Sequence, residues 1–258
     1  MNARAQETGR KPAPTEADRL RASHRMLVDM ATSLVQANGP VATTDSPDAQ
    51  FYPLELHPAE NAQGTVLSFS SLQPDFPLPP REFAGSLKDS GRTLLFVKDF
   101  ARLWYQKGLV GLSSTRQETV AALRDLIIDL PRPWTFLGAS SGGYAALYFG
   151  AYLGADQIRA FSPQTLVDRQ AFMRFSKCRP FEMGFDPADP ENDLAAQLGQ
   201  FSSLPPTHIY YGAPHNMDRK QALRLQDFDA ITLHEVQAKT HNIAQVLKKR
   251  GELHDALF

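Results

Sequence analysis

The sequence contains a single cysteine, Cys178, among its 258 residues. One thiol cannot close a disulfide within the chain, and it cannot supply the ligands of a cysteine-rich zinc site. An excess of charge of either sign is also missing, because 27 lysines and arginines face 28 acidic residues. A chain without a basic block has little sequence-independent attraction to phosphate, so nucleic acid is a poor candidate partner.

Long hydrophobic runs are absent as well. No stretch approaches the roughly 18 apolar residues of a membrane span, and the first 19 residues lack the apolar centre of a secretory signal. Hydrophobic residues still make up 42% of the chain and charged residues 21%, which is typical of a globular protein. We therefore expect a cytoplasmic protein without a membrane span, and the oligomeric state is left open.

The first 63 residues differ in pattern from the rest of the chain. Residues 1–16 are polar and show no apolar periodicity, which predicts a disordered leader. Residues 17–63 are predicted to form an N-terminal helical extension and an edge strand: a helix that ends near residue 38, a loop at 41–50 and the strand at 51–56, which contains a proline. Residues 64–258 are predicted to form one α/β domain.

From residue 64 onward, short apolar runs alternate with segments of helical length. The expected strands cover residues 65–70, 93–97, 134–137, 157–161, 208–211 and 230–236. The expected helices cover residues 81–89, 115–130, 143–153, 218–227 and 242–257. This alternation predicts an α/β fold, with a mostly parallel sheet flanked by helices.

A long segment interrupts this alternation. Residues 164–206 follow the sixth strand of the fold, and they carry several phenylalanines and prolines without a strand pattern. A connection of this length without regular structure is typical of a lid or binding insertion, so we predict a cap. Ordinary surface decoration with a small core of its own is the alternative.

The most specific motif is Gly-Ala-Ser-Ser-Gly-Gly at residues 138–143, between a predicted strand and a predicted helix. It fits the G-x-S-x-G pattern with Ser140 in register. Side chains at Gly138 and Gly142 would collide with neighbouring backbone, so glycine there permits the sharp turn that exposes the serine oxygen. A strand–helix turn without chemistry would need the small residues but no serine. Ser140 is the predicted nucleophile.

A serine nucleophile needs a general base, and the base needs an acid that orients it. In such a fold the acid and then the histidine follow the serine along the chain, each in a loop after a later strand. Asp218 and His241 stand at these places and are the predicted acid and base. Asp218 also stands where a helix begins, so a helix cap is its alternative role. His215, in the same loop as Asp218, is the main rival of His241.

Two backbone N–H groups are needed to stabilise the oxyanion of acyl transfer. The first is expected from Ser141, directly after the nucleophile. The second is expected from the loop after the strand at 65–70, where Ser71 and Leu72 stand. No His-Gly pair is found there, so the donor in this loop stays open.

Substrate contacts are expected from loops at the carboxyl ends of the strands, because these loops line the ligand crevice of parallel sheets. The loop after the strand at 93–97 carries Arg102, Trp104 and Tyr105, and the acid's loop carries His215. We predict that these four side chains contact substrate. Packing of Trp104 and Tyr105 beneath their own loop is an equally open alternative.

The motif at 138–143, followed in order by Asp218 and His241, resembles the α/β-hydrolase superfamily. The resemblance spans about residue 64 to the end of the chain. It implies an eight-stranded sheet, a Ser–His–Asp triad and acyl transfer without a cofactor or a metal. The chain departs from the family in lacking the His-Gly oxyanion pair and clear first strands.

Three shorter phrases are similar to a bacterial group associated with surface-polysaccharide gene sets. They are Trp-Tyr-Gln-Lys-Gly at 104–108, Ser-Pro-Gln-Thr at 162–165 and Thr-His-Asn at 240–242. The expected function is a serine hydrolase that cleaves a small-molecule or saccharide-linked ester, thioester or amide through an acyl-enzyme. An acyltransferase to a sugar hydroxyl, or a non-catalytic assembly protein of polysaccharide biosynthesis, is the alternative.

Overall fold

The computed structural model describes residues 15–72, 78–175 and 184–258. The predicted leader lies outside these ranges up to residue 14, but its last two residues, Thr15 and Glu16, cap and begin the first helix. Within these ranges, eight strands form one sheet in the order β1-β2-β4-β3-β5-β6-β7-β8. The strands are β1 (Val41–Thr43), β2 (Leu54–His57), β3 (Thr65–Phe69), β4 (Thr93–Val97), β5 (Trp134–Ala139), β6 (Gln157–Phe161), β7 (Thr207–Gly212) and β8 (Ile231–Val236). The predicted α/β fold with a mostly parallel sheet is confirmed.

The first two strands depart from the prediction. Residues 41–43 form β1, although residues 41–50 were expected to be a loop, because three residues are too few to show a strand period. Strand β2 lies between β1 and β4 and is antiparallel to β4, so it is not at the edge of the sheet. Pro53 directly precedes β2, where its missing N–H costs the ladder nothing.

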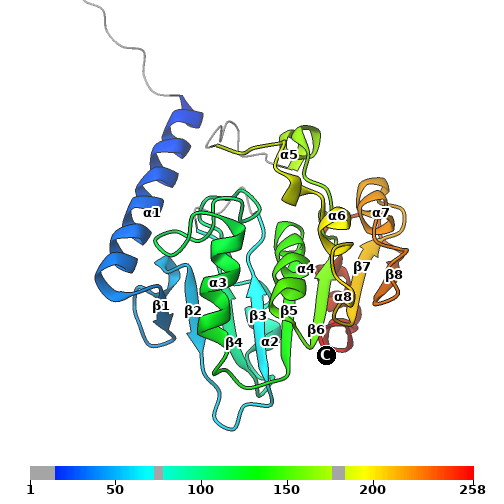
Figure 1. The fold of residues 1–258 in the computed structure, drawn as a ribbon, viewed down its shortest axis with the longest axis horizontal. Helices are drawn as coiled ribbons and strands as arrows, with labels where there is room; N and C mark the ends of the chain where they lie inside the picture. The colour runs from blue at the N-terminus through cyan, green and yellow to red at the C-terminus, as the bar shows by residue number, and fades with distance from the viewer. Residues whose placement is uncertain (1–14, 73–77, 176–183) are drawn as a thin grey trace, which may run out of the picture.

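Helices cover both faces of the sheet (Figure 1). They are α1 (Glu16–Asn38), α2 (Ala84–Leu87), α3 (Arg116–Ile127), α4 (Ser141–Leu153), α5 (Arg169–Phe175), α6 (Leu194–Leu198), α7 (Asn216–Leu223), α8 (Ile243–Arg250) and α9 (Leu253–Leu257). Helix α1 begins with a capping box, in which the Thr15 side chain accepts from the Asp18 N–H. No helix in the described ranges has the length and apolar character to cross a membrane.

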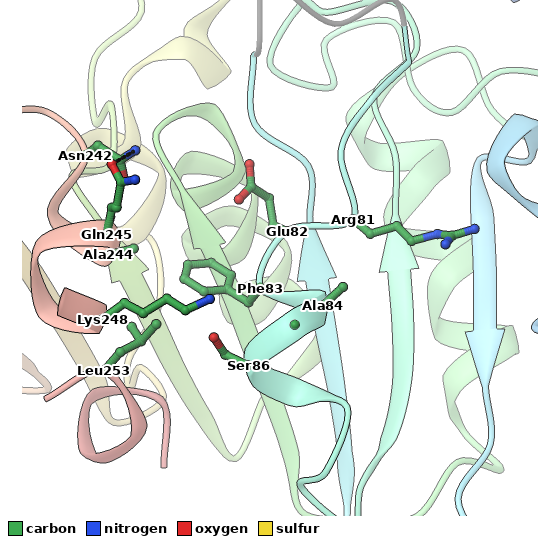
Figure 2. Close-up of a pocket in the computed structure, with 11 residues that line it drawn as sticks. Arg81, Glu82, Phe83, Ala84, Ser86, Asn242, Ala244, Gln245, Lys248 and Leu253 are labelled. Carbon is green, nitrogen blue, oxygen red and sulfur yellow. Dashed lines mark hydrogen bonds between the residues drawn. The ribbon is translucent and has the colours of Figure 1, made fainter. Parts of the chain in front are cut away.

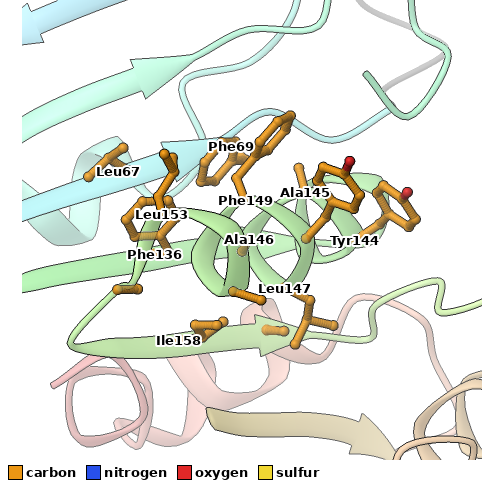
Figure 3. Close-up of a cluster of buried hydrophobic side chains, with 14 of the residues drawn as sticks. Leu67, Phe69, Phe136, Tyr144, Ala145, Ala146, Leu147, Phe149, Leu153 and Ile158 are labelled. Carbon is orange, nitrogen blue, oxygen red and sulfur yellow. The ribbon is translucent and has the colours of Figure 1, made fainter. Parts of the chain in front are cut away.

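Both faces of the sheet bury apolar side chains, as expected of a parallel sheet covered by helices. In β4, Leu95 and Val97 join the core under α3 and α4, whereas Leu94 and Phe96 join the core under α2, α8 and α9. Helix α4 is buried along nearly its whole length and packs on β3, β5 and β6 (Figure 3). The strand–helix turn before α4 is therefore held by a rigid core.

The insertion at residues 164–206 lies between β6 and β7 and holds α5, a 3₁₀ turn at Pro190–Asn192, and α6. A bridge between Leu166 and Asp193 closes its base. Its residues 176–183 lie outside the described part of the chain. Val167 and helix α6 belong to the same core as α4, so the two ends of the insertion are packed onto the body of the domain.

Candidate active site

Ser140 occupies the sharp turn between β5 and α4, with φ 56° and ψ −120°. A Cβ on Gly138 would lie 2.0 Å from the carbonyl oxygen of Gly142, and one on Gly142 would lie 2.3 Å from that of Phe69. These approaches supply the steric reason for glycine two residues before and after the serine. The strained backbone is locked by the Ser140 N–H, which donates to the Phe161 carbonyl at 2.9 Å.

The structure brings Ser140, His241 and Asp218 into one hydrogen-bonded row, although they are far apart in the chain. Ser140 Oγ lies 2.9 Å from His241 Nε2, and His241 Nδ1 lies 2.8 Å from Asp218 Oδ1. The loop between β8 and α8 supplies His241, and the first turn of α7 supplies Asp218. Asp218 is buried, whereas His241 is partly exposed. This is the arrangement in which a histidine takes a proton from a serine and a carboxylate orients the imidazole.

A fourth side chain, Gln164, also contacts the serine oxygen. Its Nε2 donates to Ser140 Oγ at 2.7 Å, and its Oε1 accepts from Trp104 Nε1 at 2.7 Å. Gln164 is buried in the loop after β6. No role was predicted for it from the sequence. The available signal was its place in a loop at the carboxyl edge of the sheet, where polar side chains of separate strands meet.

A pocket of about 350 Å³ lies between α2 and α8 (Figure 2). Asn242, which directly follows His241, lines it, and so do Ser86 of α2 and Lys248 of α8. Glu82 lines it as well, and its carboxylate accepts from the Ser71 hydroxyl. The pocket therefore borders two of the loops that were expected to form the site.

No protein-family profile matches the chain, and no curated protein matches its sequence. Solved structures do match. The capsule O-acetyltransferase of Neisseria meningitidis serogroup A has a TM-score of 0.59 at 20% identity, over 76% of this chain and 87% of that chain. A mutant of that enzyme in complex with CoA has a TM-score of 0.56 at 19% identity, over 74% and 87% of the two chains.

A fluorophosphonate-binding serine hydrolase of Staphylococcus aureus, FphF, matches with a TM-score of 0.52 at 12% identity, over 76% of this chain and 84% of that chain. These likenesses agree with the strand order and with the antiparallel β2–β4 pair. The chain adopts the α/β-hydrolase fold.

The loop that is predicted to supply the second oxyanion donor follows β3. The Leu72 N–H, one of the two donors expected there, donates to Ser141 Oγ at 2.9 Å and is therefore occupied. Leu72 would reach an oxyanion only after that bond broke. The Ser71 hydroxyl is engaged by Glu82. Ser141 begins α4, where its backbone N–H belongs to the first turn of the helix. The oxyanion roles of Ser71 and Ser141 stay predictions.

The loop after β4 is built on a buried carboxylate rather than open to a ligand. Asp99 accepts from the N–H groups of Arg102, Leu103 and Tyr105, each at 2.9 Å, and burial raises the pKa of its carboxyl. Arg102, Trp104 and Tyr105 all have φ between 51° and 61°. This tight fold buries all three side chains.

Tyr105 packs beneath its own loop, the loop after β4, instead of facing substrate. It has no exposed surface, and its hydroxyl donates to the Val97 carbonyl at 2.9 Å. Burial raises the pKa of this hydroxyl well above its ordinary value. Trp104 is equally buried and reaches the site through Gln164. The packing alternative therefore describes Tyr105, whereas Trp104 acts on the site only through another residue.

His215 stands beside the acid. Its Nδ1 accepts from the Asp218 N–H at 3.3 Å and lies 3.1 Å from Asp218 Oδ1. It contacts the acid and not the serine oxygen, so the geometry favours His241 as the base. One nitrogen of each histidine and one oxygen of Asp218 lie within 4.8 Å of one another, which is the spacing of a three-ligand cation site. A cation there would compete with the contact that orients His241.

Proposed function

We propose that this protein is a serine acyl-transfer enzyme that forms an acyl-enzyme at Ser140. The observation that supports the proposal is the row of contacts from Ser140 Oγ to His241 Nε2 at 2.9 Å and from His241 Nδ1 to Asp218 Oδ1 at 2.8 Å. The strained Ser140 backbone holds the oxygen at the carboxyl edge of the sheet, beside the start of α4. There the first N–H groups of the helix favour developing negative charge.

In the first step, Ser140 Oγ attacks the carbonyl carbon of an ester or thioester. The hydroxyl proton moves to His241 Nε2, and the carbonyl oxygen takes the negative charge. When the intermediate collapses, the bond to the alcohol or thiol breaks and the leaving group takes the proton from Nε2. Asp218 remains ionised and stabilises the imidazolium through Nδ1–H. An acceptor hydroxyl then attacks the acyl-enzyme carbonyl and gives its proton to His241 Nε2. The bond between the acyl group and Oγ breaks, and Oγ takes the proton from Nε2.

Water is the acceptor in the hydrolase that we propose first. The second candidate is transfer to a saccharide hydroxyl, and the likeness to the capsule O-acetyltransferase of Neisseria meningitidis favours it. That enzyme has been seen with CoA, which makes an acyl thioester the donor to test. The pocket beside Asn242 and Lys248 has room for part of such a donor.

The test compares Ser140→Ala with Ser202→Ala, an exposed serine in the loop before β7. The substrates are p-nitrophenyl esters of increasing acyl length and acetyl-CoA, with and without an oligosaccharide acceptor. We expect Ser140→Ala to lower kcat roughly a millionfold, by analogy with subtilisin, and Ser202→Ala to leave it unchanged. Acyl transfer that exceeds hydrolysis when the acceptor is present identifies the transferase.

Equal activity of the Ser140→Ala and Ser202→Ala variants would rule out the acyl-enzyme. A folded wild-type protein that turns over none of these substrates, and that is not labelled by a fluorophosphonate, would instead support the non-catalytic binding or assembly role.

A further inference from the structure

We propose that Gln164 is a further catalytic residue, whose side-chain amide donates to the nucleophile oxygen and directs the serine proton toward His241. The proposal rests on the proposed function, in which Ser140 is the nucleophile. It starts from the contact of Gln164 Nε2 with Ser140 Oγ at 2.7 Å, which is shorter than the 2.9 Å contact of the same oxygen with His241.

The orientation of the Gln164 amide is fixed by its other partner. An indole N–H can only donate, so the atom that faces Trp104 Nε1 at 2.7 Å must be the amide oxygen. The amide nitrogen then faces Ser140, and an amide NH₂ can only donate. Ser140 Oγ consequently accepts a hydrogen bond from Gln164 and cannot direct its own hydrogen there.

This constraint sets the direction of every proton in the row. Because the Gln164 side of Oγ is taken by a donor, the Ser140 hydrogen points to the nitrogen 2.9 Å away, His241 Nε2. That nitrogen must be unprotonated to accept, so the imidazole carries its hydrogen on Nδ1, which donates to Asp218 at 2.8 Å. The hydrogen bonds therefore run in one direction, from the Trp104 indole, which only donates, to the Asp218 carboxylate, which only accepts.

Two elements hold the Gln164 loop in place. Gln221 of α7 accepts from the Thr165 N–H at 2.7 Å and from the Leu166 N–H at 2.9 Å through its side-chain oxygen. Gln221 lies three residues after Asp218 on the same helix. On the other side, Asp99 shapes the loop that presents Trp104. The donor is therefore fixed before substrate arrives, as electrostatic stabilisation requires.

The amide acts whenever Oγ carries charge. During attack, Oγ gains negative charge as its proton moves to His241, and during breakdown of the acyl-enzyme Oγ is the leaving group and gains charge again. Gln164 donates throughout and transfers no proton itself. A hydrogen bond to a charged partner is worth about 1.5–3 kcal/mol, so its loss should slow both steps roughly tenfold to a hundredfold at 1.4 kcal/mol per tenfold.

The test is the rate constant for labelling by a fluorophosphonate in wild type, Gln164→Met and Gln164→Glu. Methionine removes the donor but still lets the Ser140 hydroxyl donate to His241 Nε2, so we expect labelling to be tenfold to hundredfold slower. Glutamate keeps the shape and the Trp104 contact, but its carboxylate accepts the Ser140 hydrogen and draws it away from His241. Gln164→Glu should therefore be slower than Gln164→Met. A purely structural role predicts the opposite order.

Gln157→Glu is the matched control, because Gln157 stands at the other end of β6 and its amide also donates to a hydroxyl, Thr135 Oγ1, at 2.8 Å. It should label at the wild-type rate. Thermal unfolding reports whether each variant is folded, and Gln164→Met decides alone if Gln164→Glu is not. If wild type is labelled and the labelling rate constant of Gln164→Met lies within twofold of the wild-type value, only this proposal is overturned. Unlabelled, folded wild type would overturn the proposed function and this proposal with it.

Discussion

Asp218 shows how single atoms divide the work of the site. Its Oδ1 accepts from His241 and lies 3.1 Å from His215, whereas its buried Oδ2 has no hydrogen-bond partner within the described part of the chain. Oδ1 is therefore the Asp218 oxygen that contacts the proposed base. This makes the position sensitive to a change of one atom.

Asp218→Asn keeps the shape but offers an amide, which favours the wrong imidazole tautomer. We expect kcat for an activated ester to fall roughly ten-thousandfold, by analogy with the chymotrypsin-type triad, with little change in KM. Steady-state kinetics of the purified variant provide the measurement, and a loss smaller than tenfold would contradict the assignment of the acid.

The sequence predicted the three residues of the row, Ser140 from its glycine spacing and Asp218 and His241 from their order along the chain, and it missed Gln164. The glycine spacing around Ser140 is a local steric requirement, so it can be recognised without the fold. Gln164 has no such pattern. Its amide is oriented by Trp104, and the loop that holds Trp104 is bonded to the buried Asp99, about 65 residues before Gln164 in the chain. The catalytic roles of all these residues stay predictions until they are measured.

Helix α8 connects the site to the pocket, because His241 and Asn242 precede it and Lys248 lines the pocket from its last turn. We predict that Lys248→Ala raises KM for acetyl-CoA and leaves KM for a neutral ester unchanged, since only the first substrate carries phosphate charge. Lys249→Ala on the same helix is the control, because Lys249 does not line the pocket. Equal KM values for acetyl-CoA in both variants would exclude the pocket as the place of an anionic donor.

Strands β7 and β8 carry a stacked pair of histidines. His208 Nδ1 lies 2.8 Å from His234 Nε2, and burial, followed by the charge of Arg159, lowers the pKa of His208 to about 4 and also lowers that of His234. The folded state therefore prefers both rings neutral. The stability that they contribute is fully present above the unfolded pKa of about 6.5 and is lost as the pH falls toward about 4.

His208→Asn should consequently flatten the fall in melting temperature between pH 7 and pH 4.5. His254→Asn, an exposed histidine of α9, is the control and should leave the slope unchanged. Differential scanning calorimetry at the two pH values measures both. The same slope in His208→Asn as in wild type would show that the pair does not titrate as described.

At the scale of elements, long segments were predictable and short ones were not. Helix α1 runs for 23 residues, and α3 for 12, so the apolar period repeats several times in each. Strand β1 has three residues and its pairing with β2 is set by the rest of the sheet. The helix expected at 81–89 covers only Ala84–Leu87, and the residue before it, Phe83, has a left-handed backbone with φ 60°.

For the whole molecule, Arg116 joins the body to the insertion. This fully buried side chain donates to the Trp104 carbonyl at 3.0 Å, to Asp189 at 3.1 Å and to Asn192 at 3.0 Å, and it lies over the Tyr144 ring. It therefore links α3, α4, the insertion and the loop that presents Trp104. The sequence predicted an insertion here but could not show what anchors it.

Arg116→Met should destabilise the fold by about 3–5 kcal/mol, because it leaves buried acceptors without their cation. Arg124→Met, on the exposed side of the same helix, should cost under about 1 kcal/mol. Urea unfolding gives both values. A cost for Arg116→Met as small as that for Arg124→Met would show that the insertion is held by other contacts.

We propose that this α/β-hydrolase fold presents Ser140 as an activated nucleophile. A fluorophosphonate probe on the full chain, followed by mass spectrometry of the intact protein and its peptides, tests this role directly. We expect one adduct per chain on Ser140, and none on the folded Ser140→Ala variant. No adduct on folded wild type, or an adduct on Ser141 or another residue in place of Ser140, would contradict it.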